Sequence, residues 1–485
     1  MSTALEGLKP ELVWKYFGEV ALIPRGSKNE TAIARYVMET AKRLGLNAKQ
    51  DKFGNVVVKK PASPGREHVR SIALQGHLDM VCEKNADTVH DFTKDPIEIV
   101  RKGNTLMANG TTLGGDNGIA VATNLAIMED RSVVHGPLEF VFTVDEETGL
   151  TGASNLGADF VESRTLMNLD SEEEGALYVG CSGGRDTVGT WIVDFEKAPA
   201  QTVAVQLKVA GLRGGHSGLE IDKGRANAIK IANRVIVSLS DLGARLSRFD
   251  GGNKRNAIPR ETVAVLFIPA KKLGDANALV DKWNFIIKAE FATVEKDLSI
   301  SLTELKGTRR GKVIRKSQQR KLCQTIMALP HGVTKMSADI PGLVETSTNV
   351  AVINTARNAI VLATSQRSSV ASELTEMVET VSATFDLGGA KVECSDGYPG
   401  WKPNLDSPIL KLAKGTYKSL YGKEPDVKAI HAGLECGIIG EKFPGMDMVS
   451  FGPTLEGVHS PDEKIYIDTV QKFWNFLLGI LKSVN

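Results

Sequence analysis

The stretch "SIALQGHLDM" (residues 71–80) places two polar side chains at the end of an apolar run. The apolar residues predict a buried strand. Alternate side chains of a strand share a face, so His77 and Asp79 are expected to point the same way. His77 is therefore either a structural histidine at a sheet edge or a metal ligand that Asp79 orients.

Strands and helices alternate around this stretch. Apolar residues at helical spacing predict helices over 11–23, 29–45 and 118–130, and "SKNE" (27–30) has the form of a capping box before the second. Apolar runs predict strands over 55–60, 71–78, 138–144, 165–170 and 176–180. The same alternation of predicted helices and strands resumes after residue 407. Strands that are apolar throughout and alternate with helices predict an α/β domain with a mostly parallel sheet.

The middle of the chain has a different pattern. Residues 203–306 predict strand, helix, strand, strand, helix, strand, and residues 315–394 partly repeat that order. We therefore predict an α/β domain formed by residues 1–187 and 398–485. An inserted α+β domain, residues 188–397, is built of two β-α-β-β-α-β-like halves.

Composition narrows the class of protein. The chain has 485 residues, 42% hydrophobic and 24% charged, with a formal net charge of +1. This balance argues against nucleic acid or an anionic membrane as a partner. No apolar run approaches the ~20 residues that span a bilayer, and the N-terminus lacks the pattern of a signal peptide. Five scattered cysteines without a C-x-x-C pair indicate a reducing, cytoplasmic setting.

Four more stretches place acidic groups or a histidine where predicted strands end or in loops. They are "TTLGGDNG" (111–118) with Asp116, "TVDEETG" (143–149) with Glu146 and Glu147, "MNLDSEEEG" (167–175) with Asp170, and "GPTLEGVHSPDE" (452–463) with His459. Each has a plainer interpretation. Asp116 could cap a helix, the two glutamates could favour a helix N-terminus, and Glu172 to Glu174 could form a solvated run. A lone histidine in a loop is weak evidence by itself.

These stretches are expected to converge, because open α/β sheets build sites at the carboxyl ends of their strands. Five carboxylates gathered there, with like charges ~4 Å apart, would repel by several kcal/mol at an effective dielectric near 20. Such a cluster must protonate, open or hold cations. Two divalent ions would supply four positive charges, and the histidines favour zinc, cobalt or manganese over calcium.

Taken together, the motifs "GHLDMV", "GTTLGGDNG", "DEETG", "NLDSEEEG", "GGHSG" (214–218) and "HSPDE" (459–463) resemble the M20 family of di-zinc metallopeptidases. Over the whole chain the similarity is to the bacterial dipeptidases of that family that cleave Xaa-His. The resemblance implies that His77 and Asp170 hold one metal, Glu147 and His459 the other, and that Asp116 bridges both. It also implies that Asp79 orients His77, that Glu146 is the general base, and that the Asp116–Asn117 peptide is cis.

The resemblance further implies a reaction and its substrates. A metal-bridging hydroxide would cleave dipeptides, including Xaa-His and β-Ala-His. The inserted domain would be a lid that carries His216 as oxyanion donor, Arg367 for the substrate carboxylate, and Asn256 near the substrate. His216 could instead be a turn histidine, and Arg367 a solvated side chain. Simple lids of this family pair between subunits, so a homodimer is a further expectation. In a two-part lid, part of that pairing would occur within one chain.

Two rival functions stay open on the sequence. An N-acyl-amino-acid amidohydrolase would use the same metals on another amide. A non-catalytic metal-binding protein of the same fold would need no free base, and Glu146 argues against it.

Overall fold

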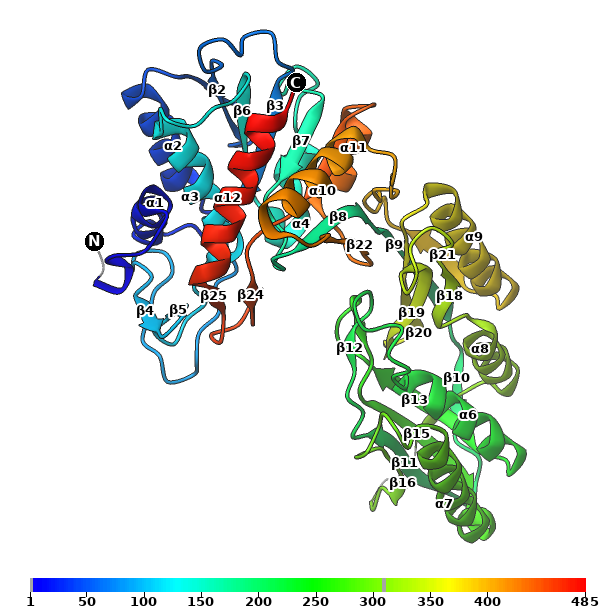
Figure 1. Cartoon of the computed structure of the whole chain (residues 1–485). Helices are drawn as coiled ribbons and strands as arrows, with labels where there is room; N and C mark the ends of the chain where they lie inside the picture. Colours follow the sequence, from blue (N-terminus) through cyan, green and yellow to red (C-terminus); the bar gives the residue numbers. More distant parts are fainter. Residues whose placement is uncertain (1–2, 308–310) are drawn as a thin grey trace. The chain divides into compact units, whose positions relative to one another are not determined.

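The computed structural model describes residues 3–307 and 311–485 and divides into two compact units (Figure 1). Unit 1 comprises Met1–Gly180, Pro403–Ala429 and Leu434–Asn485. Unit 2 comprises Cys181–Lys402 and Ile430–Gly433, so its chain is inserted within that of unit 1.

Unit 1 is built on an eight-stranded sheet. Its order is β1 (Asn47–Gln50), β2 (Val56–Lys60), β6 (Leu138–Thr143), β3 (Ile72–His77), β7 (Thr165–Asn168), β23 (Asp447–Ser450), β8 (Ala176–Cys181) and β22 (Asp426–Ile430). The strands β6, β3, β7 and β23 pair in parallel, whereas β1, β2 and β6 pair antiparallel. The expected mostly parallel sheet is therefore present at the centre, and every residue of β3 and β6 is buried.

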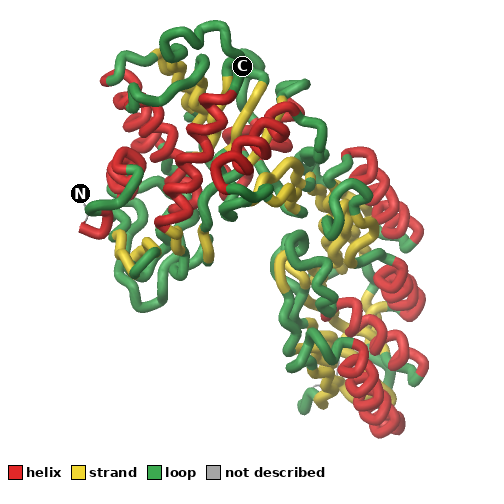
Figure 2. The backbone as a smooth tube through the Cα atoms, in the orientation of Figure 1, coloured by secondary structure: helices red, strands yellow, loops and turns green. Residues whose placement is uncertain are grey.

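Helices pack around this sheet, as Figure 2 shows. They are α1 (Glu11–Ala21), α2 (Thr31–Arg43), α3 (Gly115–Glu129), α4 (Glu146–Gly149), α5 (Thr151–Ser154), α10 (Pro408–Tyr421), α11 (Glu435–Lys442) and α12 (Ile467–Ser483). Helix α3 packs on β3, and α10 packs on β23 and α12. A second, four-stranded sheet of unit 1 runs in the order β24 (Leu455–Glu456), β25 (Lys464–Tyr466), β5 (Thr105–Ala108), β4 (Ile99–Lys102).

Unit 2 contains a nine-stranded antiparallel sheet. Its path is β16 (Ser299–Glu304), β11 (Thr202–Ala210), β15 (Thr262–Pro269), β13 (Arg245–Gly251), β19 (Val344–Thr355), β20 (Ala359–Ser368), β9 (Gly183–Ile192) and β21 (Lys391–Cys394), with β18 (Gly332–Met336) also on β19. Helices α6 (Ala228–Asp241), α7 (Leu273–Glu290), α8 (Lys316–Ala328) and α9 (Ala371–Leu387) lie along one face of the sheet (Figure 1).

The two predicted halves are visible in this sheet. The chain order β11, α6, β13, β15, α7, β16 forms one half, and β9, α8, β19, β20, α9, β21 forms the other. In each half the first strand lies between the third and fourth. The halves meet in the sheet where β13 pairs with β19 at Gly251 and Ile353. The second half takes its first strand, β9, from before the first half, which the sequence pattern alone did not reveal.

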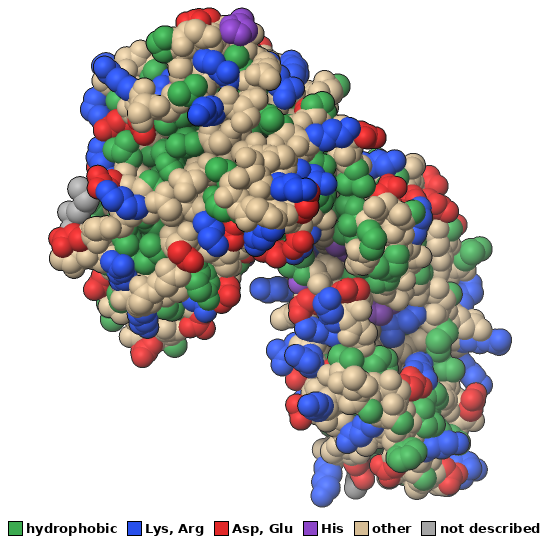
Figure 3. All heavy atoms as spheres, in the orientation of Figure 1, with side chains coloured by type: hydrophobic (Ala, Val, Ile, Leu, Met, Phe, Trp, Pro, Cys, Tyr) green, Lys and Arg blue, Asp and Glu red, His purple; other side chains and the backbone are tan. Residues whose placement is uncertain are grey.

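Smaller elements complete the two units. In unit 2, β10 (Phe195–Lys197) pairs with β17 (Lys312–Ile314), and β12 (Gly215–His216) pairs with β14 (Ala257–Ile258). Two short 3-10 helices cover Thr3–Leu5 and Ala270–Lys272. Basic and acidic side chains are mixed over the face drawn in Figure 3, as expected from the near-zero net charge. No helix in the described part of the chain is both long and apolar enough to span a bilayer.

Candidate metal centre

The candidate ligands of unit 1 meet where its parallel strands end. His77 is the last residue of β3, Asp170 follows β7, and Glu146 and Glu147 begin α4 after β6. Nε2 of His77 lies 3.0 Å from Oδ1 of Asp116 and 3.3 Å from Oδ1 of Asp170. Parallel strands bring their carboxyl ends to one edge of the sheet, which explains why distant motifs converge.

Asp116 connects two groups of side chains. Its Oδ2 lies 3.2 Å from Nε2 of His459, and the same nitrogen lies 3.0 Å from Oε2 of Glu147. His77, Asp116 and Asp170 thus form one cluster with metal-ligand spacing, and Asp116, Glu147 and His459 form a second. The clusters share only Asp116. The expected cis peptide between Asp116 and Asn117 is confirmed.

Asp79 lies beyond the end of β3, and its carboxylate faces the imidazole of His77 as expected. Its Oδ1 is 3.3 Å from Nδ1 of His77 and accepts the backbone N–H of Glu146 at 3.0 Å. Its Oδ2 accepts the N–H of Glu147 at 3.2 Å and the hydroxyl of Ser27 at 2.8 Å. Burial opposes ionisation of Asp79, but His77 and these donors lower its pKa to about 2. Asp79 therefore connects the imidazole with the loop that carries both glutamates.

Burial and close charges shift the pKa values of the side chains in this cluster. Burial raises the pKa of Asp170 to about 6 and holds that of Glu146 well above its usual range. Hydrogen bonding to Asp116 and Glu147 raises the pKa of His459 to about 11. Burial opposes the charged form of His77, but the carboxylates of Asp170 and Asp116 raise its pKa well above normal. Without cations, the raised pKa values of His77 and His459 favour protons on the imidazole nitrogens that cations would otherwise occupy.

The residues present fit a pair of divalent cations. Oε1 of Glu147 is buried and has no hydrogen-bond partner in the described structure, as expected of an atom reserved for a ligand. The donors are imidazole nitrogens and carboxylate oxygens, a set that suits zinc, cobalt or manganese. Each cluster offers three side chains and leaves positions for water or substrate.

Three sequence interpretations at this site are wrong. "SKNE" is not a capping box: Ser27 bonds to Asp79, and Glu30 accepts the backbone N–H of Lys28 and of Asp145. Asp116 does not cap α3, whose N-cap is Gly114. The run Glu172 to Glu174 is not a fully solvated run, because only Glu173 has a largely exposed side chain. Burial raises the pKa of Glu172 to about 8, and tyrosine hydroxyls donate to Glu173 and Glu174. In all three cases, side chains contact residues that are distant in the chain instead of taking the local role that the sequence predicted.

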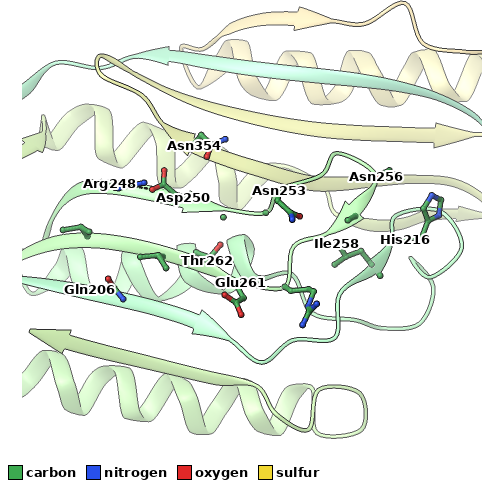
Figure 4. A pocket seen from close by; sticks show the side chains of 17 residues that line it. Gln206, His216, Arg248, Asp250, Asn253, Asn256, Ile258, Glu261, Thr262 and Asn354 are labelled. Carbon is green, nitrogen blue, oxygen red and sulfur yellow. Dashed lines mark hydrogen bonds and ion pairs between the residues drawn. The ribbon is translucent and has the colours of Figure 1, made fainter. Parts of the chain in front are cut away.

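The predicted substrate-binding residues belong to unit 2. His216 and Asn256 line a cavity of about 860 Å³ on the sheet of that unit, where Figure 4 shows them at one end. Nδ1 of His216 accepts the N–H groups of Gly218 (3.2 Å) and Leu219 (3.1 Å). Burial, with help from Arg367, lowers its pKa to about 4. His216 is therefore a neutral imidazole whose Nε2 carries the proton.

Arg367 lies near His216 but does not line this cavity. Its side chain is 7% exposed and donates from Nη1 to the hydroxyl of Tyr398 at 2.8 Å. Its Nε is buried without a partner, and no described carboxylate lies within ion-pair distance. A guanidinium buried to this extent is not a solvated surface side chain, so the solvated interpretation is wrong.

Comparison with known proteins agrees with this geometry. The model of peptidase family M20/M25/M40 matches residues 73–483. The chain belongs to this family. It is 41% identical over 481 residues to the cytosol non-specific dipeptidase of Escherichia coli, covering 99% of each chain. The predicted enzyme class, a peptide hydrolase, is thereby confirmed, and peptidases of this family are metal-dependent.

Solved structures support the fold of this M20 chain. The aminoacylhistidine dipeptidase of Vibrio alginolyticus is 41% identical, has a TM-score of 0.91 and is matched over 99% of this chain and 98% of its own. An aminopeptidase of Bacillus cereus is only 17% identical, with a TM-score of 0.57 over 98% of both chains, and shares the fold.

Several polar groups around the site escaped sequence reasoning. Glu435 is fully buried and accepts from the side chains of Gln75 and Thr143, and Gln75 accepts from Asn168 at 2.6 Å. Arg25 and Glu463 are also buried. Glu463 ends the motif "HSPDE" and Gln75 lies in "SIALQGHLDM", but the sequence indicated no role for either side chain.

Proposed function

We propose that this M20 peptidase is a metal-dependent dipeptidase that hydrolyses Xaa-His dipeptides, β-Ala-His among them. The observation that carries the proposal is the pair of ligand clusters that share Asp116. The Xaa-His preference rests on the 41% identity to the Vibrio aminoacylhistidine dipeptidase. The Escherichia coli relative is named as a cytosolic enzyme, and we propose the same compartment here.

In this proposal His77 and Asp170 would hold one cation, Glu147 and His459 would hold the other, and Asp116 would contribute to both sites. Zinc is the cation best matched to this mixture of imidazole and carboxylate ligands. When bound, the cations would supply Lewis acidity that polarises the amide carbonyl and makes water acidic enough to attack near neutral pH.

Glu146 is the proposed general base. It directly precedes the ligand Glu147, and its carboxylate lies in one group with the carboxylate of Glu147 and the imidazole of His77. As the general base, Glu146 would accept a proton and later return it to the leaving amine. The Asp79 carboxylate holds the backbone of Glu146 and so fixes this position.

Residues of unit 2 are proposed to recognise the substrate. The Nε2–H of His216 is a fixed donor for the developing oxyanion, and losing one such donor typically costs ~10²–10³ in rate. Arg367 would bind the free carboxylate of the dipeptide, which a guanidinium can hold with two hydrogen bonds. Asn256 is exposed beside His216 and is proposed to contact the substrate.

The rival amidohydrolase differs in its substrate alone. Its substrate has no free amino terminus and carries an acyl group instead. Activity on β-Ala-His, other Xaa-His dipeptides and acetylated amino acids should be compared for the same metal-loaded preparation. Faster turnover of acetylated amino acids than of any dipeptide would favour the amidohydrolase. The expected homodimer stays a prediction, which light scattering of the full chain would test.

The decisive experiment separates metal binding from proton transfer. Glu146→Gln should lower kcat by at least ~10²-fold, the lower end for a lost general base, while two metal ions per chain are retained in elemental analysis. Glu147→Gln should lose metal as well as activity, and the exposed Glu162→Gln is the matched control. Chelation should abolish wild-type activity, and added zinc should restore it. Wild-type turnover by Glu146→Gln would refute the assignment of the base.

A further inference from the structure

Glu463 makes an unusual set of contacts with the loop that carries Asp116. The side chain is 2% exposed. Its Oε2 accepts the backbone N–H of Leu113 (2.7 Å) and Gly114 (2.9 Å), and its Oε1 accepts those of Gly115 (2.7 Å) and Asp116 (3.2 Å). Four consecutive amides thus point at one carboxylate, which uses all of its acceptor sites.

Arg25 holds the same loop from its carbonyl side. It is 3% exposed, and its Nη1 donates to the carbonyls of Leu78 (3.0 Å) and Asp79 (2.7 Å). Its Nη2 donates to the carbonyl of Gly114. Gly114 therefore bonds to Glu463 through its N–H and to Arg25 through its carbonyl, and the two buried charges have opposite signs.

The glycines of "TTLGGDNG" are explained by these contacts. Gly114 has a φ of +69°, and a Cβ at this position would lie 2.6 Å from Nη2 of Arg25. A Cβ on Gly118 would lie 2.5 Å from the same atom. The glycines thus admit a guanidinium against the backbone.

We propose that Arg25 and Glu463 form a clamp that positions the Asp116 bridge and sets the affinity of the centre for its cations. The clamp joins three segments: the end of β3 with Asp79, the loop with Asp116, and the loop with His459, four residues before Glu463. Neither side chain belongs to a ligand cluster. Both are positioning residues, and the inference rests on the metal site of the proposed function.

Glu463→Gln tests the clamp with almost no change in shape. A glutamine oxygen accepts from two of the four amides, and its NH₂ group faces the other two donors. Affinity for zinc, measured by competition with a chromophoric chelator, is expected to fall 10–100-fold, the range for lost supporting contacts. At saturating zinc, KM should stay within a few-fold of wild type. In the metal-free protein, the amides of 113–116 should exchange hydrogen faster.

Controls separate this inference from the proposed function. Asp462→Asn changes an exposed neighbour and should leave zinc affinity and exchange unchanged. Arg25→Lys keeps the charge but loses the forked contact, and it should lower zinc affinity, which provides a second test if Glu463→Gln does not fold. If wild-type protein binds no zinc, the proposed function fails. If wild type binds zinc and Glu463→Gln binds it equally tightly, the clamp alone is refuted.

Discussion

Asp79 joins three parts of the centre through one carboxylate. It faces Nδ1 of His77, accepts the amides of Glu146 and Glu147, and accepts the hydroxyl of Ser27. Its side chain is fully buried, yet its pKa is lowered to about 2 because every one of these contacts favours the anion. Orientation of His77 and placement of Glu146 therefore depend on the same residue.

Asp79→Asn should lower metal affinity or kcat/KM by about 10–100-fold. Asparagine has one acceptor oxygen, so its NH₂ group would oppose the amide N–H of either Glu146 or Glu147. Zinc titration and steady-state kinetics would measure the loss. Ser27→Ala removes a single donor and should have a much smaller effect. Wild-type kinetics in Asp79→Asn would contradict the orienting role.

At the scale of elements, strand ends and helix caps decide which side chains meet. In unit 2, Asn227 caps α6 by accepting the N–H groups of Ile229 (3.0 Å) and Lys230 (3.1 Å). Its Nδ2 donates to the carbonyl of Val350 at 2.8 Å on β19. Because β19 belongs to the other half of the sheet, this cap also stabilises the contact between the halves.

Asn227→Ala should destabilise unit 2 by about 1–3 kcal/mol. The cap contributes ~1–2 kcal/mol, and the carbonyl of Val350 loses a buried donor. Urea unfolding followed by tryptophan fluorescence would measure the change, because three of the five tryptophans, Trp191, Trp283 and Trp401, lie in unit 2. Asn253→Ala in an exposed loop is the control. An unchanged midpoint would show that the cap does not support the fold of unit 2.

At the scale of the whole molecule, the stability of unit 1 is expected to depend on cations and that of unit 2 on pH. The acidic cluster of unit 1 is expected to gain stability from cations. In unit 2, burial lowers the pKa of His331 to about 4 and of His431 to about 3. An unfolded histidine has a pKa near ~6.5. Between these values the unfolded chain binds more protons than the folded one, so the free energy of unfolding falls as pH falls.

His331→Gln should flatten this dependence. For one histidine that stays neutral when folded, the slope is at most about 1.4 kcal/mol per pH unit, which gives about 2 kcal/mol between pH 6.5 and 5. Urea midpoints of wild type and variant, compared from pH 7 to 5, would show the difference. His68→Gln, a change in unit 1, is the control. Parallel pH dependence in wild type and His331→Gln would refute the assignment.

The sequence by itself determined the α/β architecture, the repeated pattern of the inserted unit, and the order of the site motifs. These features are local: periodicity reports burial, and His77, Asp170 and Glu146 follow strands whose ends converge by topology. Tertiary structure alone decided that β9 completes the second half of its sheet, that Ser27 donates a hydrogen bond to Asp79, and that Arg25 and Glu463 hold the Asp116 loop. Such contacts join residues that are far apart in the chain, and a hydrogen bond to the backbone of a distant loop leaves no periodic pattern in the sequence.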